Sequence, residues 1–384
     1  MTASYPAPPV AGQHFDVAIV GAGVVGLWCA REAMRAGLKA VVIERNEPGA
    51  GASGGVIGAL MPNRPVEASA KQGFQLDGLL SLPAAVAALE AETGIACGYR
   101  RCGRLVPLRE EDTRIRHAAW ATDAERLWPA LPDGERASWC VSDDAPFASL
   151  VAPDAAPFGF SHDTFSARIR PRAYVAALAA SIAGHVAFMR ATVLEVQADG
   201  RIDLEGGGTV VAGRIILANG FLSFGLANRF GVPVDGDGVK GQSALLRPRT
   251  PFDPATPILF DGSIYVIAHD DGMVAVGSTS ETAWEETTST DDRLNIVIGK
   301  AQALCPALLE AEIVERWAGV RPRSATRSPL VGPLPGAERL ILATGGYKIT
   351  LAIAHMMGKA AVEYASGGVP MLPAGFDPAT CLKR

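Results

Sequence analysis

The chain has 384 residues, of which 48% are hydrophobic and 20% are charged, and its formal net charge is −5. This balance is typical of a globular protein with a large core, and the length is sufficient for two domains. There is no sustained run of Lys and Arg, which argues against nucleic-acid binding. No apolar run reaches the roughly 18 residues of a membrane-spanning helix, and residues 1–12 lack the features of a signal peptide, so we expect a cytoplasmic protein.

The cysteines and histidines are scattered along the chain. The six cysteines form no C-x-x-C pair, and the six histidines show no spacing typical of metal ligands. This distribution predicts neither a disulfide framework nor a metal site.

A strand–turn–helix pattern begins near the N-terminus. Residues 16–20 are apolar and rich in β-branched side chains, which predicts a buried strand, and residues 24–36 continue as an apolar helix. Between them, Gly21, Gly23 and Gly26 form a G-x-G-x-x-G motif, which permits a tight turn, close approach of a pyrophosphate and close helix–strand packing. Because the helix N-terminus attracts phosphates, the pattern predicts a dinucleotide site; a glycine turn in another α/β protein is the alternative.

The next strand ends on an acidic residue. Apolar residues 40–43 are followed by Glu44, whose carboxylate can accept hydrogen bonds from ribose hydroxyls. Residues 49–62, GAGASGGVIGALMP, are so small that we expect the backbone itself to approach a flat or anionic ligand, with Ser53 as a donor to a phosphate. A flexible loop is the alternative interpretation of this composition.

Helical and strand patterns alternate in the middle of the chain. Helical patterns at 79–94 and 112–128 precede a stretch rich in Pro, Asp and Ala at 129–157, which predicts a domain crossing. Further on, the buried strand 215–217 closes on Ala218-Asn219-Gly220, a turn of small residues where a cofactor would fit.

The last third contains an antiparallel pattern and a second strand–turn–helix unit. Residues 223–314 are punctuated by Pro and Gly, and Asp270-Asp271-Gly272 predicts a hairpin turn. We expect this sheet to form the wall of a substrate site. The strand 340–343, the turn 344–346 and the helix 349–365 again direct a helix N-terminus at a ligand.

These patterns predict an α/β protein. We expect a Rossmann-like dinucleotide-binding domain assembled from three segments, with an α+β substrate domain built on an antiparallel sheet interleaved with it. The predicted ranges are 14–75, 150–222 and 315–366 for the first domain, and 76–149 and 223–314 for the second.

The motifs together resemble FAD-dependent oxidoreductases of the glycine oxidase, D-amino-acid oxidase and sarcosine oxidase type. The resemblance covers residues 16–365, and its spacing is closest to glycine oxidases. The Cys-Tyr-Thr segment that carries covalent flavin in sarcosine oxidases is absent, which implies noncovalent FAD. Five blocks stand in the family's order: VGAGVVG with Glu44, GASGGVIGALMP, ATVLEV, GVRP at 319–322, and ATGGYKITLA at 343–352.

The resemblance also implies which residues surround FAD. The glycine motif and its helix would meet the pyrophosphate, Glu44 and its neighbour the ribose, and the remaining segments the adenine and the flavin ring. The candidate FAD-binding residues are Gly21, Gly23, Val24, Val25, Gly26, Glu44, Arg45, Ala52, Ser53, Ile57, Gly58, Ala59, Val193, Ala218, Gly220, Gly346, Tyr347, Lys348, Ile349, Thr350 and Leu351.

Three residues match the family's catalytic positions. Arg321 matches the arginine that binds the substrate carboxylate, and its planar fork suits that bidentate contact. Tyr265 matches a tyrosine that assists it, and Lys348 lies near the substrate and the ring. The alternative for Arg321 is a structural salt bridge, for Tyr265 a core aromatic residue, and for Lys348 a surface lysine. Arg323 and Arg327 are candidates to recognise a second acidic group on the substrate.

The implied reaction is oxidation of the C–N bond of a small amino acid or N-alkyl amino acid by hydride transfer to flavin N5. The imine would hydrolyse, and oxygen would reoxidise FAD to give hydrogen peroxide. The lysine that sarcosine oxidases use with oxygen is missing; its place falls near Val276. A dehydrogenase of an amino acid or 2-hydroxy acid with another acceptor, or a flavin-binding protein without turnover, therefore remains open. The sequence also leaves open the substrate side chain, its stereochemistry and a homo-oligomeric state.

Overall fold

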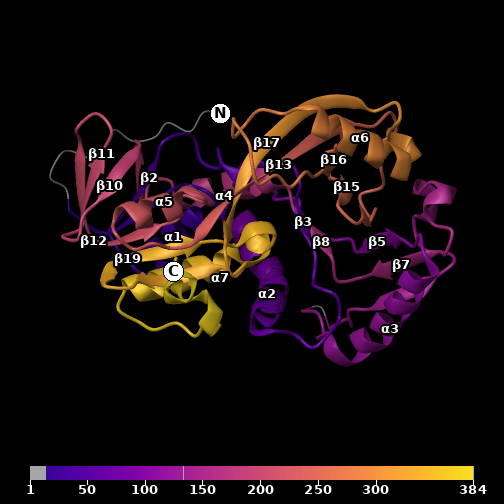
Figure 1. Ribbon diagram of the computed structural model, residues 1–384, viewed down its shortest axis with the longest axis horizontal. Helices are drawn as coiled ribbons and strands as arrows, with labels where there is room; N and C mark the ends of the chain where they lie inside the picture. The colour runs from indigo at the N-terminus through magenta and orange to yellow at the C-terminus, as the bar shows by residue number, and fades with distance from the viewer. Residues whose placement is uncertain (1–13, 133, 384) are drawn as a thin grey trace.

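The computed structural model describes residues 14–132 and 134–383, so the expectation drawn from residues 1–12 lies outside it. Two eight-stranded sheets and a small three-stranded one form the framework. Figure 1 shows the two large sheets in two lobes placed side by side, with helices packed around each.

The first sheet is the predicted Rossmann-like sheet. Its parallel strands run in the order β9 (Ala187–Arg190), β2 (Ala40–Glu44), β1 (His14–Val20), β12 (Thr209–Leu217) and β19 (Ala337–Thr344). The register brings Val20 beside Ile43 and Leu217, so the carboxyl ends of these strands form one edge. Ligands of open α/β sheets bind outside such an edge.

Helices cover one face of the first sheet. α1 (Val24–Arg35) lies between α4 (Pro171–Ile182) and α7 (Thr350–Ala365), and their apolar side chains pack on Val17 and Ile19 of β1. α1 and α7 approach so closely that a Cβ on Gly358 would lie 2.7 Å from the Cβ of Trp28.

α2 (Ala70–Thr93) packs against α4 and α7 at the outside of this layer. By length and composition alone it is long and apolar enough to cross a membrane, which the sequence had not led us to expect. A single helix of this kind is weak evidence for a membrane span, because the core helix of a soluble protein passes the same test.

The other face of the first sheet is covered by a β-ribbon and a short helix. β10 (Val193–Val196) and β11 (Arg201–Leu204) continue β12 as two hairpins, and α5 (Leu222–Arg229) packs beside them. β18 (Leu330–Leu334) pairs antiparallel with β19. This face buries the alternate side chains of β1, including Ala18 and Val20.

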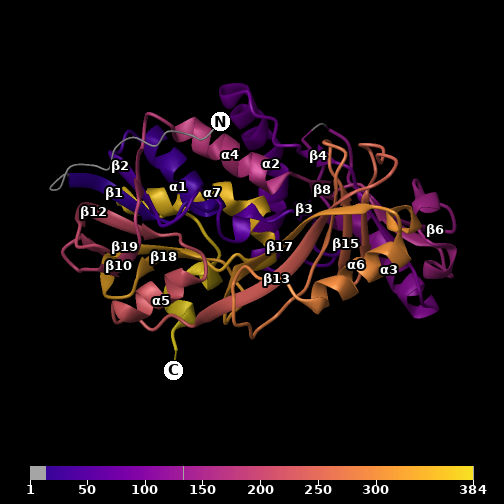
Figure 2. The ribbon, with the colours of Figure 1, turned by 90° about the horizontal axis from the view of Figure 1, so that it is seen from above.

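The second sheet is largely antiparallel. Its longest strands, β13 and β17, pair along nearly their whole length and run from one lobe into the other (Figure 2). α6 (Asp292–Leu304) covers one face, and β15 and β16 form the hairpin predicted at residues 270–272. The strand order is β17 (Glu312–Ser324), β13 (Gly236–Arg247), β16 (Val274–Gly277), β15 (Ile264–Ala268), β14 (Ile258–Asp261), β5 (Arg104–Pro107), β7 (Phe160–Asp163) and β6 (Trp139–Ser142).

The remaining elements complete the second lobe. α3 (Glu111–Leu127) lies beside β6 and β7. The three-stranded sheet consists of β3 (Ala59–Leu60), β8 (Ala167–Arg168) and β4 (Arg100–Arg101).

The division into two domains stays a prediction, but the sheets bear on its ranges. Every strand of the first sheet falls within the segments assigned to the FAD-binding domain. β7 also falls within those segments, although it pairs in the second sheet. Residues 76–93 of α2 were assigned to the substrate domain, but they pack on the helices of the first sheet.

Candidate functional site

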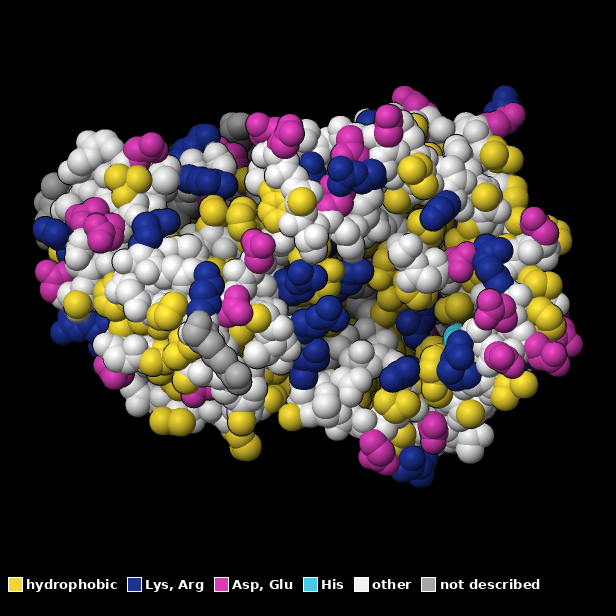
Figure 3. All heavy atoms as spheres, in the orientation of Figure 1, with side chains coloured by type: hydrophobic (Ala, Val, Ile, Leu, Met, Phe, Trp, Pro, Cys, Tyr) yellow, Lys and Arg dark blue, Asp and Glu magenta, His cyan; other side chains and the backbone are white. Residues whose placement is uncertain are grey.

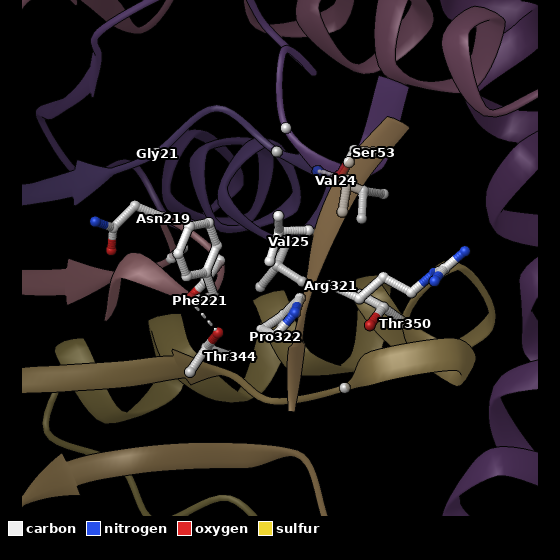
Figure 4. A pocket seen from close by; sticks show the side chains of 18 of the residues that line it. Gly21, Val24, Val25, Ser53, Asn219, Phe221, Arg321, Pro322, Thr344 and Thr350 are labelled. Carbon is white, nitrogen blue, oxygen red and sulfur yellow. Dashed lines mark hydrogen bonds between the residues drawn. The ribbon is translucent and has the colours of Figure 1, made fainter. Parts of the chain in front are cut away.

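A cavity of about 980 Å³ lies where the carboxyl edge of the first sheet faces the second sheet. Figure 4 shows Gly21, Asn219 and Phe221 at one end of it and the guanidinium of Arg321 at the other. Figure 3 shows a hollow between the lobes with Lys and Arg side chains gathered around it. The cavity is large enough for an extended ligand and touches both lobes.

The glycine motif forms one end of the cavity. Gly21 has a φ of 104°, and a Cβ there would lie 2.6 Å from the Cα of Asn219. Gly23 also lines the cavity. Gly26 does not; a Cβ there would lie 1.9 Å from the carbonyl oxygen of Gly21, so its role is the close helix–strand packing expected of the third glycine.

The N-terminus of α1 is held by Ser53, which lies in a short 3-10 helix, η1 (Ala52–Gly54). The Ser53 Oγ accepts a hydrogen bond from the backbone N–H of Val24 at 3.0 Å. Because this oxygen accepts in that bond, the hydroxyl hydrogen is still available for donation. The phosphate contact of Ser53 stays a prediction. The other N–H groups of the first turn of α1 have no partner within the helix and can bind an anion.

Glu44 is fixed at the end of β2. Its Oε2 accepts the backbone N–H of Ala22 at 2.9 Å, and its Oε1 accepts that of Asn46 at 2.9 Å. Each carboxylate oxygen has a second lone-pair direction, so the side chain is oriented while it can still accept from a pair of hydroxyls. Arg45 and Asn46 line the cavity beside it.

Most of the predicted FAD-binding residues are brought together around this cavity. Gly58 is an exception: a Cβ there would lie 1.6 Å from the carbonyl oxygen of Ile169, so it serves packing between two backbones. The predicted residues that line the cavity are Gly21, Gly23, Val24, Val25, Glu44, Arg45, Ala52, Ser53, Ile57, Ala59, Val193, Ala218, Gly220, Gly346, Tyr347, Lys348, Ile349, Thr350 and Leu351.

The second strand–turn–helix unit closes the cavity from below. Thr344 at the end of β19 donates its hydroxyl to the carbonyl of Gly220 at 2.8 Å, which ties the two turns together (Figure 4). Tyr347 follows with a φ of 49°, a left-handed conformation that is costly for a bulky residue. Its ring lies 5.7 Å from the Nζ of Lys348 and 5.9 Å from the guanidinium of Arg323. The strained backbone thus places an aromatic ring between two cations at the cavity.

One face of the second sheet forms the opposite wall. Cross-strand neighbours on one face of a sheet lie side by side. Tyr265 is paired with Gly277, Gly277 with Ser243, and Ser243 with Trp317. On the same face, Gly319 lies two residues after Trp317 in β17 and pairs with Gly241 of β13. Arg321 lies two residues after Gly319 in β17. The residues between these positions face α6, so the wall of the cavity and the core under α6 are opposite faces of the second sheet.

Arg321 is a half-buried cation that faces the cavity. A Cβ on Gly241 would lie 2.0 Å from its Nη1, so the guanidinium lies directly on that glycine. Its hydrogen bonds are long: 3.3 Å to the Ser278 hydroxyl and 3.5 Å to the Thr279 carbonyl. Burial lowers the pKa of Arg321, although an arginine stays charged in proteins.

The nearest acidic side chain does not neutralise Arg321. Glu281 raises its pKa only as a minor influence, and the Glu281 carboxylate is already bound by Arg293 at 2.7 Å and by Gln242 at 3.0 Å. No other carboxylate in the part of the chain that the structure describes forms an ion pair with Arg321. A half-buried charge in this state favours an anionic ligand.

Tyr265 lies on the same wall. Burial raises the pKa of its hydroxyl, an effect opposed by the positive charge of Arg321 and Arg104. The phenol is therefore neutral near pH 7 and can donate a hydrogen bond.

Several residues of the site were not predicted. Ser243 and Trp317 line the cavity because the pairing of β13 with β17 places them there, and the only available signal was their alternation along these strands. Ser278, which directly follows β16, lines it as well. Met61 and Gln75 line it from the loop after β3 and from α2. Arg323 and Arg327, which we considered for a second acidic group, are not among the residues that line it. Across residues 14–132 and 134–383, no group of three or more His, Cys, Asp and Glu side chains could hold a metal ion.

Comparison with known proteins agrees with this geometry. A family model described as DAO, FAD dependent oxidoreductase, matches residues 16–364. A glycine oxidase of Pseudomonas aeruginosa is 30% identical over 382 residues, which cover 94% of this chain and 98% of that protein. Glycine oxidase from Geobacillus kaustophilus has a crystal structure with a TM-score of 0.85 at 22% identity, covering 97% of this chain and 99% of that one. Iminodiacetate oxidase from Chelativorans gives 0.83 at 22% identity, covering 94% and 98%; at such identities the likeness shows the fold. The chain belongs to the DAO family of FAD-dependent oxidoreductases and is an FAD-dependent amino acid or amine oxidoreductase of the glycine oxidase type.

Proposed function

We propose that the protein oxidises the C–N bond of a small amino acid or N-alkyl amino acid, with Arg321 as the anchor of the substrate carboxylate. The observation that carries this proposal is the half-buried guanidinium of Arg321, which faces the cavity and forms hydrogen bonds only with a neutral hydroxyl and a carbonyl. A carboxylate would supply the missing counter-charge through two parallel hydrogen bonds. An amine without a carboxylate would leave the charge unpaired.

FAD fits the other end of the cavity. The N–H groups at the start of α1 suit a pyrophosphate, and Glu44, oriented by two backbone N–H groups, suits the ribose. Held there, FAD would supply the acceptor for the hydride of the substrate Cα–H, and with oxygen as the final electron acceptor the products would be hydrogen peroxide and an imine that hydrolyses. We expect the FAD to be noncovalent.

The remaining role of the residues of this chain is to orient the substrate. The neutral phenol of Tyr265 can donate to the substrate carboxylate beside Arg321, since both stand on one wall of the cavity. Lys348 lies at the start of the unit that leads into α7, where its charge adds to the positive end of the helix. No side-chain base is required, because the substrate amine reacts in its neutral form.

A dehydrogenase that uses another acceptor is the second candidate, and one observation favours it. Val276, at the place where the resemblance expects a lysine that acts with oxygen, is fully buried on the face of the second sheet that packs under α6. Among the described residues that line the cavity, Lys348 is the only lysine.

An anaerobic titration separates these proposals. The purified protein would be titrated with glycine, sarcosine, D- and L-amino acids and 2-hydroxy acids while the visible flavin band is followed. Bleaching by an amino acid that reverses on admission of air would support the oxidase. Bleaching that persists in air but reverses with an artificial acceptor would support the dehydrogenase. Bleaching by 2-hydroxy acids alone would overturn the assignment of an amine substrate.

A further inference from the structure

A second cavity of about 650 Å³ lies beside the first, between α3 and the β5, β6 and β14 part of the second sheet. Pro62 and Asn63 line both cavities, so the two share a wall. The proposed function does not use this second cavity. Its lining combines arginines with large aromatic rings: Arg64, Arg104, Arg109, Trp120, Trp139 and Phe260.

Arg104 has an unused donor in this cavity. Its side chain is 9% exposed, and its Nε donates to Asp163 at 2.7 Å. Its Nη1 meets the sulfur of Met61 at 3.8 Å, and its Nη2 is buried without a hydrogen-bond partner. A buried donor on a charged group that lacks an acceptor is costly, which makes the position suited to an anionic ligand.

Asp163 does not depend on the unused nitrogen. Besides the Nε of Arg104, its carboxylate accepts the backbone N–H groups of Phe165 and Ser166, at 3.1 and 2.7 Å, and the Ser166 hydroxyl at 3.0 Å. These bonds hold Arg104 in place and leave Nη2 free. The other arginine of the cavity is Arg64, an exposed residue whose guanidinium lies 6.0 Å from the ring of Trp120 and for which the described residues show no ion pair.

The other charged groups of the cavity are accounted for. Arg109 is neutralised by Asp261, which accepts from its Nε and Nη2 at 3.0 and 2.7 Å. Glu110 is exposed to solvent. Burial lowers the pKa of His117 to about 4, so the imidazole is neutral, and its buried Nδ1 has no partner. The groups left for a ligand are therefore the unpartnered Nη2 of Arg104, whose charge is already balanced by Asp163, the guanidinium of Arg64 and a neutral imidazole.

Side chains on one face of the second sheet lead from the first cavity to the second. The ring of Phe260 lies 4.9 Å from that of Tyr265 and 6.0 Å from the guanidinium of Arg104. The register places Arg104 beside Ile258 on the face that also carries Phe260 and Tyr265. A substrate anchored at Arg321 could therefore extend past these rings toward Arg104.

We propose that the second cavity binds a distal carboxylate of the substrate, which makes the substrate an amino acid whose side chain or N-substituent ends in a carboxylate. This inference rests on the proposed function, because it takes the amino-acid carboxylate to lie at Arg321. The apolar rings between the two sites would cover the methylene groups of such a substrate, while the unused Nη2 of Arg104 and the guanidinium of Arg64 would receive the distal anion.

The test compares N-(carboxyalkyl)glycines of increasing length with their terminal amides, which have the same shape without the distal charge. We expect kcat/KM to be at least about tenfold higher for the acid than for the amide at the best length, the effect of one charge-assisted hydrogen bond. Arg104→Lys and Arg64→Gln should each reduce this acid-to-amide ratio several-fold. Arg126→Gln, an exposed arginine of α3 outside the cavity, should leave the ratio unchanged.

A binding measurement makes the inference independent of turnover. Linear dicarboxylic acids and their monoamides would be titrated calorimetrically into the FAD-loaded protein, with the same variants. Tighter binding of the diacid, lost in Arg64→Gln, would support the second site. Equal affinities of diacid and monoamide at every length would overturn it. If sarcosine reduces the flavin while acid and amide react equally, the inference fails and the proposed function stands; if no amino acid reduces the flavin, the proposed function itself fails.

Discussion

Replacing Arg321 by Met should stabilise the fold while it removes activity. The guanidinium is half-buried, lies on Gly241 and has only long bonds to neutral groups. Replacement of a poorly compensated buried ion by an apolar side chain is commonly neutral or stabilising by about 1–4 kcal/mol. Since Ser278 and Thr279 recover part of the cost, we expect a gain of roughly 1–2 kcal/mol in the free energy of unfolding. For a chain of this size that corresponds to a rise of roughly 1–3 °C in the unfolding temperature.

Arg31→Met is the matched control for this experiment. Arg31 is fully buried, and its guanidinium forms a bidentate ion pair with Glu92 at 2.9 and 2.5 Å. Loss of such a pair should lower the free energy of unfolding by roughly 1–3 kcal/mol. Both variants would be measured by calorimetry at one scan rate, with saturating FAD and without substrate. A fall in the unfolding temperature of Arg321→Met as large as that of Arg31→Met would mean that Arg321 is a structural residue.

Three further variants test the site. Gly241→Ala puts a Cβ 2.0 Å from the Nη1 of Arg321 and should lower kcat/KM for carboxylate substrates by roughly 10-fold or more. The control is Gly299→Ala, which has open space around the new Cβ and should leave kcat/KM unchanged. Tyr265→Phe should lower kcat/KM about 10-fold. Because the pKa of Tyr265 is raised, its phenol stays protonated. This variant should therefore leave the pH profile unchanged between about pH 6 and 9. Glu44→Gln places an amide against a backbone N–H of the turn and should weaken FAD binding about 10-fold, measured by flavin fluorescence on dilution. Unchanged flavin affinity would argue against a ribose contact at Glu44.

Local patterns predicted the parts of the fold that local interactions determine. The strand before Gly21, the helix after it, and the acid at Glu44 form one continuous unit, and the structure confirms its order and its boundaries within two residues. The start of α2 could have been predicted from the sequence, but we did not predict it. Ser69 and Gln72 form a capping box, with bonds of 2.9 and 3.4 Å between backbone and side chains. That signal extends the helix nine residues before the pattern we had recognised at residue 79.

The arrangement of the candidate site depends on contacts between distant segments. Nothing near Arg321 in the sequence indicates that Gly241 lies under its guanidinium, because that contact follows from the pairing of β13 with β17. β5, β7 and β6 join the second sheet across a similar distance in sequence. The second cavity, with Arg104 at its centre, could not be recognised before this pairing was known. Strand register between remote segments is set by the whole core and leaves little local trace.

The most direct measurement is the anaerobic rate of flavin reduction by one reactive amino acid and by the amine of the same skeleton without the carboxylate, in the parent protein and in Arg321→Met. Two charge-assisted hydrogen bonds to a carboxylate correspond to roughly 3–4 kcal/mol, or 10²–10³-fold. The proposed site predicts that the amino acid reacts faster than the amine by about this factor in the parent protein and that the two rates become similar in the variant. The same preference for the amino acid in both proteins would contradict the placement of the substrate carboxylate at Arg321.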